Sequence, residues 1–239
     1  MSLVLSSAPD ADGLAHEAAV WFLACAELIV DAPIAVCLAG GSTPRALYTL
    51  LAQPPYRDAL PWGRLHWFFG DERCVPRDDP RSNVRMAREA MLGAAPVPAG
   101  NVHAPPESLT PMETAQGYEA MLRAFYGADA LDLRRPLFDI MLLGLGADGH
   151  TASLFPGEAG MAETEAWVIP VSTKSQPEPR VSLTLPVLDS SRNLAFLVSG
   201  AQKRDALARL RAGDRSIPAA LVHPAGAVHV FCDQEAQGR

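Results

Sequence analysis

A histidine with a carboxylate two residues before it is the strongest candidate for acid–base chemistry in this sequence. The two residues belong to Asp148-Gly149-His150, which follows an apolar run and a glycine-rich turn. Histidine titrates near neutral pH, and a nearby carboxylate can fix its tautomer and raise its basicity. We expect His150 to act as a general base oriented by Asp148; the alternative is a histidine that only caps or packs.

The remaining histidines have no comparable setting, and we interpret them as structural: His16, His66, His103, His223 and His229. No further ligands at suitable spacing accompany Asp148 and His150, so no metal is expected. The cysteines show neither a C-x-x-C pair nor zinc spacing, and the chain is expected to be reduced and cytoplasmic.

A glycine-rich turn offers a seat for an anion. The segment Gly40-Gly41-Ser42-Thr43-Pro44 joins an apolar run to a predicted helix that begins at the proline. The N–H groups of Gly41, Ser42 and Thr43 would then be free at the positive end of the helix, where a phosphate is stabilised. The turn lacks the Lys-Ser/Thr ending of a Walker loop, and a tight, well-capped connection is the alternative.

Two cations in later loops could complete the neutralisation of a phosphate dianion. Arg180 offers a guanidinium fork and Lys203 a compact ammonium group. Lys203 opens a predicted helix, where the helix dipole disfavours a positive charge unless an anion offsets it. A solvated surface charge is the alternative for both residues, and the role of Lys174, the only other lysine, stays open.

A third cation follows the apolar run at residues 65–69, in the tripeptide Asp71-Glu72-Arg73. Ion pairing within the tripeptide is one interpretation. An Arg73 that faces the cleft would instead stabilise an oxyanion formed in acyl chemistry. Cys74 has no neighbouring histidine in the sequence, which argues against an activated thiol, and the absence of a Gly-x-Ser-x-Gly motif argues against a serine hydrolase.

These candidates follow short apolar runs that alternate with helical patterns. Uninterrupted runs are typical of buried parallel strands and occur at 34–39, 65–69, 138–143, 167–171, 194–198 and 227–232. Helical spacing occurs at 14–29, 44–53, 82–92, 110–126 and 202–211. Asp10 is expected to cap the first of these helices, and Thr110 begins a capping box.

The alternation predicts an α/β fold of Rossmann-like type, with a doubly wound, mostly parallel sheet and helices on both faces. Such sheets bind ligands beyond the carboxyl ends of their strands, so the active site is expected there. The length of 239 residues suits a single domain over 1–239. The proline-rich segments at 53–61 and 94–106 are expected to be surface connections within that domain and not linkers between domains.

Composition excludes several classes of partner. The formal charge is -7 and the pI about 5.3, which argue against a nucleic-acid or anionic-membrane surface. No apolar run is long enough to span a bilayer, and the first residues lack the basic region of a secretory signal. We expect a small-molecule ligand, no membrane or nucleic-acid partner, and a monomer or small homo-oligomer.

Residues 144–149 match the dinucleotide motif G-x-G-x-x-G literally. The context argues against it, because Pro156 comes too soon for a long helix and the next strand ends at Ser172-Thr173, where an acidic ribose ligand belongs. No organic cofactor is therefore expected.

Taken in order, the loops resemble the 6-phosphogluconolactonase family, within the larger group that includes the glucosamine-6-phosphate deaminases. The resemblance rests on residues 39–44, 70–73 with 78–83, 144–156, 180–186 and 200–203. It implies hydrolysis of 6-phospho-D-glucono-1,5-lactone to 6-phospho-D-gluconate in the oxidative pentose phosphate pathway, without metal or cofactor. It also implies site residues, which are His150 as base, Asp148 orienting it, Arg73 stabilising the alkoxide, and Gly41, Ser42, Thr43, Arg180 and Lys203 holding the phosphate.

Two rival functions share these features. A deaminase of the same group is expected to carry a glutamate shortly after the histidine, where this chain has Leu154-Phe155, and to lack the arginine at position 73. A non-catalytic sugar-phosphate sensor would keep the phosphate loops without needing a base. The sequence departs from the lactonase pattern at Val84, where an aromatic residue is expected, and in the loop at 172–179.

Overall fold

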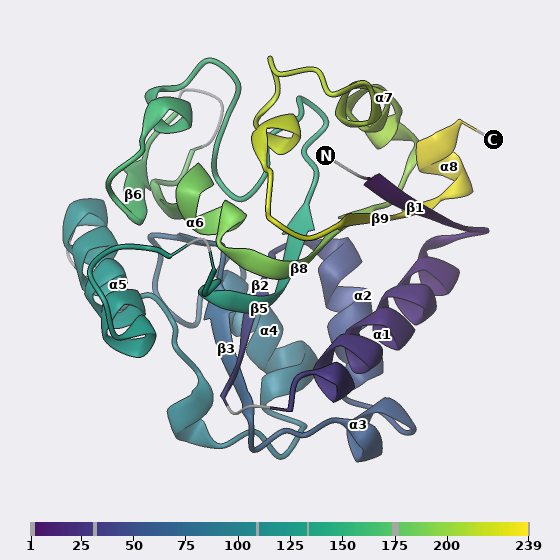
Figure 1. Ribbon diagram of the computed structural model, residues 1–239, viewed down its shortest axis with the longest axis horizontal. Helices are drawn as coiled ribbons and strands as arrows, with labels where there is room; N and C mark the ends of the chain where they lie inside the picture. The colour runs from purple at the N-terminus through teal and green to yellow at the C-terminus, as the bar shows by residue number, and fades with distance from the viewer. Residues whose placement is uncertain (1–2, 31–32, 109, 133, 174–176, 239) are drawn as a thin grey trace.

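Six parallel strands form the main sheet of the computed structural model, which describes residues 3–30, 33–108, 110–132, 134–173 and 177–238. Across the sheet these are β1 (Leu3–Ala8), β9 (Val228–Asp233), β8 (Ser191–Val198), β5 (Phe138–Gly144), β2 (Ile34–Leu38) and β3 (Leu65–Phe69) (Figure 1). All but β1 coincide with predicted strands. Strand β1 is not predicted from the sequence, because this edge strand is half exposed and its apolar run is only three residues long. Lys174 lies outside the described residues.

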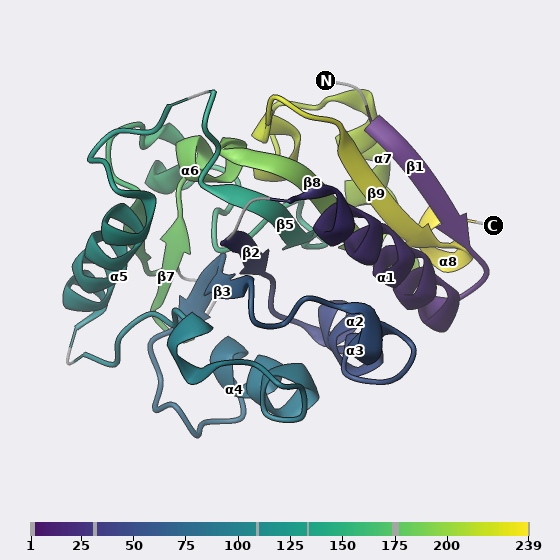
Figure 2. The same cartoon turned by 60° about the horizontal axis from the view of Figure 1, so that its bottom comes forward.

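Helices cover both faces of this sheet, which confirms the doubly wound fold (Figure 2). One face packs against α1 (Ala11–Leu28), α2 (Ser42–Leu51), α3 (Tyr56–Ala59) and α4 (Asn83–Ala87). The other packs against α5 (Pro111–Tyr126), α6 (Leu185–Asp189), α7 (Arg204–Ala212) and α8 (Gln234–Gln237). Alternate strand residues serve the two cores: Ile140 and Leu142 face the first group, and Met141 and Leu143 face the second. Burial on both faces explains the uninterrupted apolar runs.

The predicted helix caps are present. The Asp10 side chain accepts a hydrogen bond from the Gly13 N–H at 2.8 Å, and the Thr110 hydroxyl accepts one from the Glu113 N–H at 3.2 Å. The bounds of all the predicted helices shift by one to three residues, and two of the helices differ in a way that matters for the site or the fold. Helix α2 begins at Ser42, so its proline is the third residue rather than the first. The helix expected over 82–92 is divided into α4 and a π-helical turn, Arg88–Leu92.

A second, antiparallel sheet of three strands lies beside the main one, in the order β4 (Asp71–Arg73), β7 (Arg180–Leu183), β6 (Val168–Val171). It corrects two expectations. The run at 167–171 is a strand of this small sheet, not of the parallel sheet, and Arg180 begins a strand instead of lying in a loop. A five-residue apolar run does not encode which sheet it joins, since that depends on pairing with segments distant in sequence.

Short 3₁₀ turns complete the described elements, at Ala99–Asn101, Ala159–Ala162, Ala201–Lys203 and Pro218–Leu221. After β5 the chain forms no long helix before β6, in agreement with the argument against a dinucleotide site. Among the helices in the described ranges, none has both the length and the apolar character needed to cross a membrane.

Candidate active site

A cavity of about 280 Å³ opens at the carboxyl ends of the central strands, where the fold predicts a site. Its walls come from the loops after β2, β3, β5 and β8 and from the small sheet. Most predicted site residues line it: Gly41, Ser42, Thr43, Arg73, His150, Arg180 and Lys203. Asp148 does not line the cavity and instead contacts His150 from behind. The fold therefore brings together residues that are up to 162 positions apart in the sequence.

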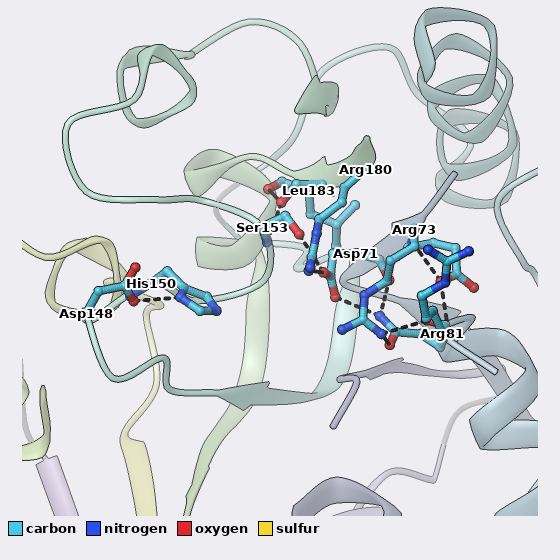
Figure 3. Close-up of polar contacts among 11 residues, drawn as sticks. Asp71, Arg73, Arg81, Asp148, His150, Ser153, Arg180 and Leu183 are labelled. Atoms are coloured by element: carbon cyan, nitrogen blue, oxygen red, sulfur yellow. Dashed lines mark hydrogen bonds and ion pairs between the residues drawn. The ribbon is translucent and has the colours of Figure 1, made fainter. Parts of the chain in front are cut away.

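The His150 ring is held by Asp148. The distance between His150 Nδ1 and Asp148 Oδ1 is 2.6 Å, and the His150 backbone N–H donates to the same oxygen at 3.1 Å (Figure 3). An ionised carboxylate only accepts hydrogen bonds, so Nδ1 carries the proton and Nε2 is left as the basic nitrogen. The ring also packs on Phe155, with centroids 4.6 Å apart. This arrangement fixes both the tautomer and the orientation of the imidazole.

The electrostatics of Asp148 favour its ionised form. Burial would raise the pKa of this carboxyl, but hydrogen bonds from the His150 backbone and ring, together with the charge of a protonated His150, hold the pKa below its ordinary value. Asp148 therefore stays anionic at neutral pH, as its predicted orienting role requires.

The turn before α2 has the geometry of an anion seat. Gly41 is the N-cap with φ of 107°, a left-handed region that favours glycine. Within the described part of the chain, no group accepts a hydrogen bond from the Gly41, Ser42 or Thr43 N–H. The start of α2 at Ser42 leaves these amides at the helix terminus, so the predicted seat survives the corrected helix boundary.

Arg180 is a buried cation beside a buried carboxylate. Its Nη1 lies 3.7 Å from Asp71 Oδ2, and both side chains are only 9% exposed. Burial lowers the pKa of Arg180 and the charge of Arg73 lowers it further, whereas Asp71 raises it. The pKa of an arginine is so high that the group stays charged regardless. The site therefore contains a partly compensated positive charge.

Lys203 occupies the junction of the 3₁₀ turn Ala201–Lys203 and α7, in agreement with the prediction that it opens a helix. Burial lowers the pKa of its ammonium group, and the negative charge of Asp148 opposes that effect. Lys203 thus lies in the field of the His150–Asp148 pair. Arg180 and Arg73 form a separate group on the small sheet (Figure 3).

Arg73 lines the cavity, and its guanidinium forms no ion pair with the carboxylates of Asp71 and Glu72. Its Nη1 donates to Asn83 Oδ1 at 2.6 Å and to the Arg81 carbonyl at 2.8 Å. No carboxylate in the described residues forms an ion pair with it. The alternative of ion pairing within the tripeptide is therefore wrong, and Arg73 is available to a ligand.

The side chain of Glu72 has a different task. Its carboxylate accepts hydrogen bonds from the Ser82 hydroxyl and from the N–H groups of Arg73, Asn83 and Val84, at 2.8–2.9 Å. Burial raises the pKa of Glu72 although these four donors lower it. The carboxylate ties β4 to the first turn of α4 and does not line the cavity.

Sequence reasoning missed two polar residues that line the cavity between Arg73 and Arg180. Asn83 and Asp71 are both buried, with the Asn83 amide donating to Asp71 Oδ1 at 3.0 Å. Ser153 donates to Asp71 Oδ2 at 2.6 Å from behind. Both residues belong to motifs that are visible in the sequence, but no sequence signal indicates that their side chains meet.

Other candidate chemistries find no support. Burial and the charge of Glu72 raise the pKa of the Cys74 thiol, which disfavours a thiolate nucleophile. In the described ranges no three histidine, cysteine, aspartate or glutamate side chains gather in a way that could hold a metal ion. His66 Nδ1 lies 2.9 Å from His103 Nε2, and the two rings pack in an aromatic cluster with Phe68 and Phe125. These histidines therefore contribute to packing.

Comparison with known proteins gives a consistent result. The family model for glucosamine-6-phosphate isomerases/6-phosphogluconolactonase matches residues 9–231. A 6-phosphogluconolactonase of Synechocystis is 41% identical over 205 residues, covering 84% of this chain and 82% of that protein. The chloroplastic 6-phosphogluconolactonase 3 of Arabidopsis thaliana is 36% identical, covering 85% of this chain and 64% of that protein. The crystal structure of 6-phosphogluconolactonase from Thermotoga maritima has a TM-score of 0.84 at 30% identity, covering 98% and 100% of the two chains.

Proposed function

The chain belongs to the glucosamine-6-phosphate isomerase/6-phosphogluconolactonase family, and from that membership we propose that it is a 6-phosphogluconolactonase. The reaction is hydrolysis of 6-phospho-D-glucono-1,5-lactone to 6-phospho-D-gluconate, in the oxidative pentose phosphate pathway. The observation that carries the proposal is the contact of 2.6 Å between His150 Nδ1 and Asp148 Oδ1. His150 lines the same cavity as three cations and the N-terminus of α2. Such a cavity suits a sugar phosphate that must be attacked by water.

The hydrolytic step begins at His150. Its Nε2 takes a proton from water as the water oxygen attacks the lactone carbonyl carbon, and Asp148 stabilises the imidazolium that forms. The carbonyl π bond opens to an alkoxide, which the guanidinium of Arg73 stabilises. When the carbonyl re-forms, the bond to the ring oxygen breaks and the imidazolium returns its proton to that oxygen. The product is an open-chain acid, which loses a proton to bulk water at neutral pH.

The phosphate of the substrate is held by the amides at the start of α2 together with Arg180 and Lys203. Helix-terminal N–H groups and fixed cations bind a dianion without requiring the protein as a whole to be basic. This resolves the contrast between a net charge of -7 and an anionic substrate. Binding the distant phosphate also orients the lactone carbonyl toward His150.

The first experiment is an assay on freshly generated lactone. Glucose-6-phosphate dehydrogenase supplies 6-phosphogluconolactone, and its loss is followed at neutral pH with the parent protein, with His150→Ala, and with buffer alone. We expect the parent to exceed the spontaneous decay and His150→Ala to lose about 10²- to 10⁴-fold of the enzymatic rate. His223→Ala is the matched control, since that histidine is exposed and outside the cavity.

The two rival functions predict different results. Amine release from glucosamine-6-phosphate without lactone hydrolysis would support a deaminase, and sugar-phosphate binding without turnover would support a sensor. The packing against His150 disfavours the deaminase, because Leu154 and Phe155 are buried apolar residues where a carboxylate is expected. The proposal also includes a single domain over 1–239, a cytoplasmic location and a monomeric or small homo-oligomeric state.

A further inference from the structure

We propose that Asn83 is a positioning residue that sets the guanidinium of Arg73 for the reaction. The role rests on the proposed lactonase function and on the part that Arg73 has in it. Asn83 is only 2% exposed and is the first residue of α4, after the N-cap Ser82. It is hydrogen-bonded to both Arg73 and Asp71, and Asp71 in turn forms an ion pair with Arg180 at 3.7 Å.

The hydrogen bonds of the Asn83 amide allow one orientation only. Its Nδ2 donates to the Asp71 carbonyl at 2.9 Å and to Asp71 Oδ1 at 3.0 Å, and both of these groups accept. Its Oδ1 accepts from Arg73 Nη1 at 2.6 Å, and an arginine can only donate. A flipped amide would place donor against donor and acceptor against acceptor. The amide therefore fixes Arg73 and Asp71 relative to each other.

The backbone around Asn83 keeps this amide in place. The Asn83 N–H donates to Glu72 Oε1 at 2.8 Å, and the Val84 N–H donates to Glu72 Oε2 at the same distance. On the cavity side Gly40 makes the room, because a Cβ on Gly40 would lie 2.0 Å from Asn83 Oδ1. The side chain is thus confined by β4 on one side and by the turn before α2 on the other.

As a consequence, the three nitrogens of the Arg73 guanidinium differ in their hydrogen-bond partners. Nη1 is committed to Asn83 and to the Arg81 carbonyl. Nε is buried, whereas Nη2 is not, and no group in the described ranges accepts a hydrogen bond from either atom. Nη2 is accordingly the donor left for the alkoxide. A long side chain with several rotamers has its charged end fixed by a rigid amide before the substrate arrives.

This role predicts a loss in kcat rather than in KM. Alkoxide stabilisation acts in the transition state, so a misplaced Arg73 slows turnover without weakening ground-state binding. Misplacement of a catalytic group by about 1 Å costs about 10²-fold. We expect Asn83→Ala to lower kcat by about 10- to 100-fold and to leave KM within about twofold.

The test is a double-mutant cycle on fresh 6-phosphogluconolactone with parent, Asn83→Ala, Arg73→Ala and the double variant. If Asn83 acts through Arg73, the double variant is no slower than Arg73→Ala alone. Additive losses, or a KM that rises as much as kcat falls, would overturn the role while leaving the lactonase function standing. A parent protein that only matches buffer would overturn both the function and the role.

A second variant separates positioning from folding. Asn83→Asp keeps the oxygen that Arg73 needs but sets a second carboxyl group against Asp71. Positioning predicts that kcat for Asn83→Asp exceeds that for Asn83→Ala, because the retained oxygen can still accept the hydrogen bond from Arg73 Nη1. A purely structural role predicts the reverse order and overturns the proposal. If Asn83→Ala does not fold, Asn83→Ser replaces it in the cycle.

The matched control is Asn193→Ala. The Asn193 amide also donates to a backbone carbonyl, that of Asp139 at 3.0 Å, but near the amino end of β8, away from the cavity. We expect parental kcat and KM from this variant, with melting temperatures recorded for every protein in the set. A matching loss of kcat in Asn193→Ala would overturn the assignment of the Asn83 effect to the site.

Discussion

Arg73 and Arg180 lie directly opposite each other in the antiparallel pair of β4 and β7. Like charges at facing positions of a sheet destabilise it, so this arrangement needs compensation. Part of it comes from Asp71, whose Oδ2 lies 3.7 Å from Arg180 Nη1, and the charges of Glu178 and Glu72 act on Arg180 in the same direction. Under the proposed function, a bound phosphate and a developing alkoxide would add further negative charge beside these two guanidinium groups. The small antiparallel sheet thus places two cations on the cavity wall of an acidic protein.

The first prediction concerns Arg180 as a phosphate ligand. We expect Arg180→Ala to raise KM for 6-phosphogluconolactone strongly and to change kcat at saturation far less, since a phosphate contact acts in both the ground state and the transition state. Initial rates over a range of fresh lactone measure both constants. Arg192→Ala is the control, because Arg192 pairs with Asp139 outside the cavity and is 58% exposed. Equal KM values for Arg180→Ala and parent would remove Arg180 from the phosphate site.

The second prediction concerns pH and Lys203. Burial holds the pKa of this ammonium below its ordinary value of 10.5, so the group loses its charge at a lower pH than an exposed lysine. Affinity for 6-phosphogluconate, measured by calorimetry, should therefore decrease as the pH rises toward the lowered pKa of Lys203. The stable product is used because the lactone decays in alkali.

Lys203→Arg is the control for that titration. Arginine keeps its charge throughout the range, so the alkaline decrease in affinity should disappear in this variant. An identical pH profile for parent and Lys203→Arg would show that another group titrates, and that Lys203 does not contribute its charge to binding.

The third prediction concerns stability in acid. Asp233 is 3% exposed and accepts hydrogen bonds from the Ser199 hydroxyl and from the N–H groups of Gly200 and Ala236. Burial would raise the pKa of Asp233, but these donors outweigh it and hold the pKa below its ordinary value. The stability that the carboxylate contributes is therefore complete above about pH 4 and is lost as the pH falls through the lowered pKa.

Asp233→Asn tests this linkage. The amide would set its NH₂ group against donors, so we expect a loss of about 1–3 kcal/mol in the free energy of unfolding at pH 7. The difference from the parent should shrink in acid, where the parent also loses its carboxylate. Urea unfolding at several pH values measures it. A difference that stays constant down to pH 2 would show that ionisation of Asp233 does not stabilise the fold.

The sequence predicted those parts of the site whose partners are close neighbours in the chain. Asp148 and His150 are two residues apart, and the Gly41 turn and the Thr110 cap depend on contacts within four residues. Local backbone geometry is enough to bring such groups together. The main sheet was predicted for a similar reason, since burial on both faces leaves uninterrupted apolar runs.

The missing parts depend on contacts between distant segments. Ser153 reaches Asp71 across 82 positions, and β7 pairs with β4 across more than a hundred. No periodicity encodes such a pairing, so the small sheet and the Arg73–Arg180 register were not predictable from one sequence. The Asn83 amide was missed for a related reason: its motif is local, but its orientation is set by β4 and by the space above Gly40.

The fourth prediction concerns Gly146, which leaves room for the hydrogen bond between His150 and Asp148. Its N–H donates to the His150 carbonyl at 2.8 Å, and its carbonyl accepts from the Gly149 N–H at 3.0 Å, so the turn around it is tight. A Cβ built on Gly146 would lie 2.0 Å from His150 Nδ1 and 2.6 Å from Asp148 Oδ1. Any side chain at this position would therefore disrupt the hydrogen bond between His150 Nδ1 and Asp148 Oδ1.

Gly146→Ala should consequently act like a partial loss of His150. Displacing the imidazole from Asp148 removes the orientation of Nε2, and we expect kcat to decrease by about 10²-fold or more, with a much smaller change in KM. Gly63→Ala is the matched control, because a Cβ there meets no atom within 4 Å and Gly63 lies outside the cavity. An unchanged kcat in Gly146→Ala would mean that water is activated without the hydrogen bond between His150 and Asp148. The base would then have to be another residue on the cavity wall.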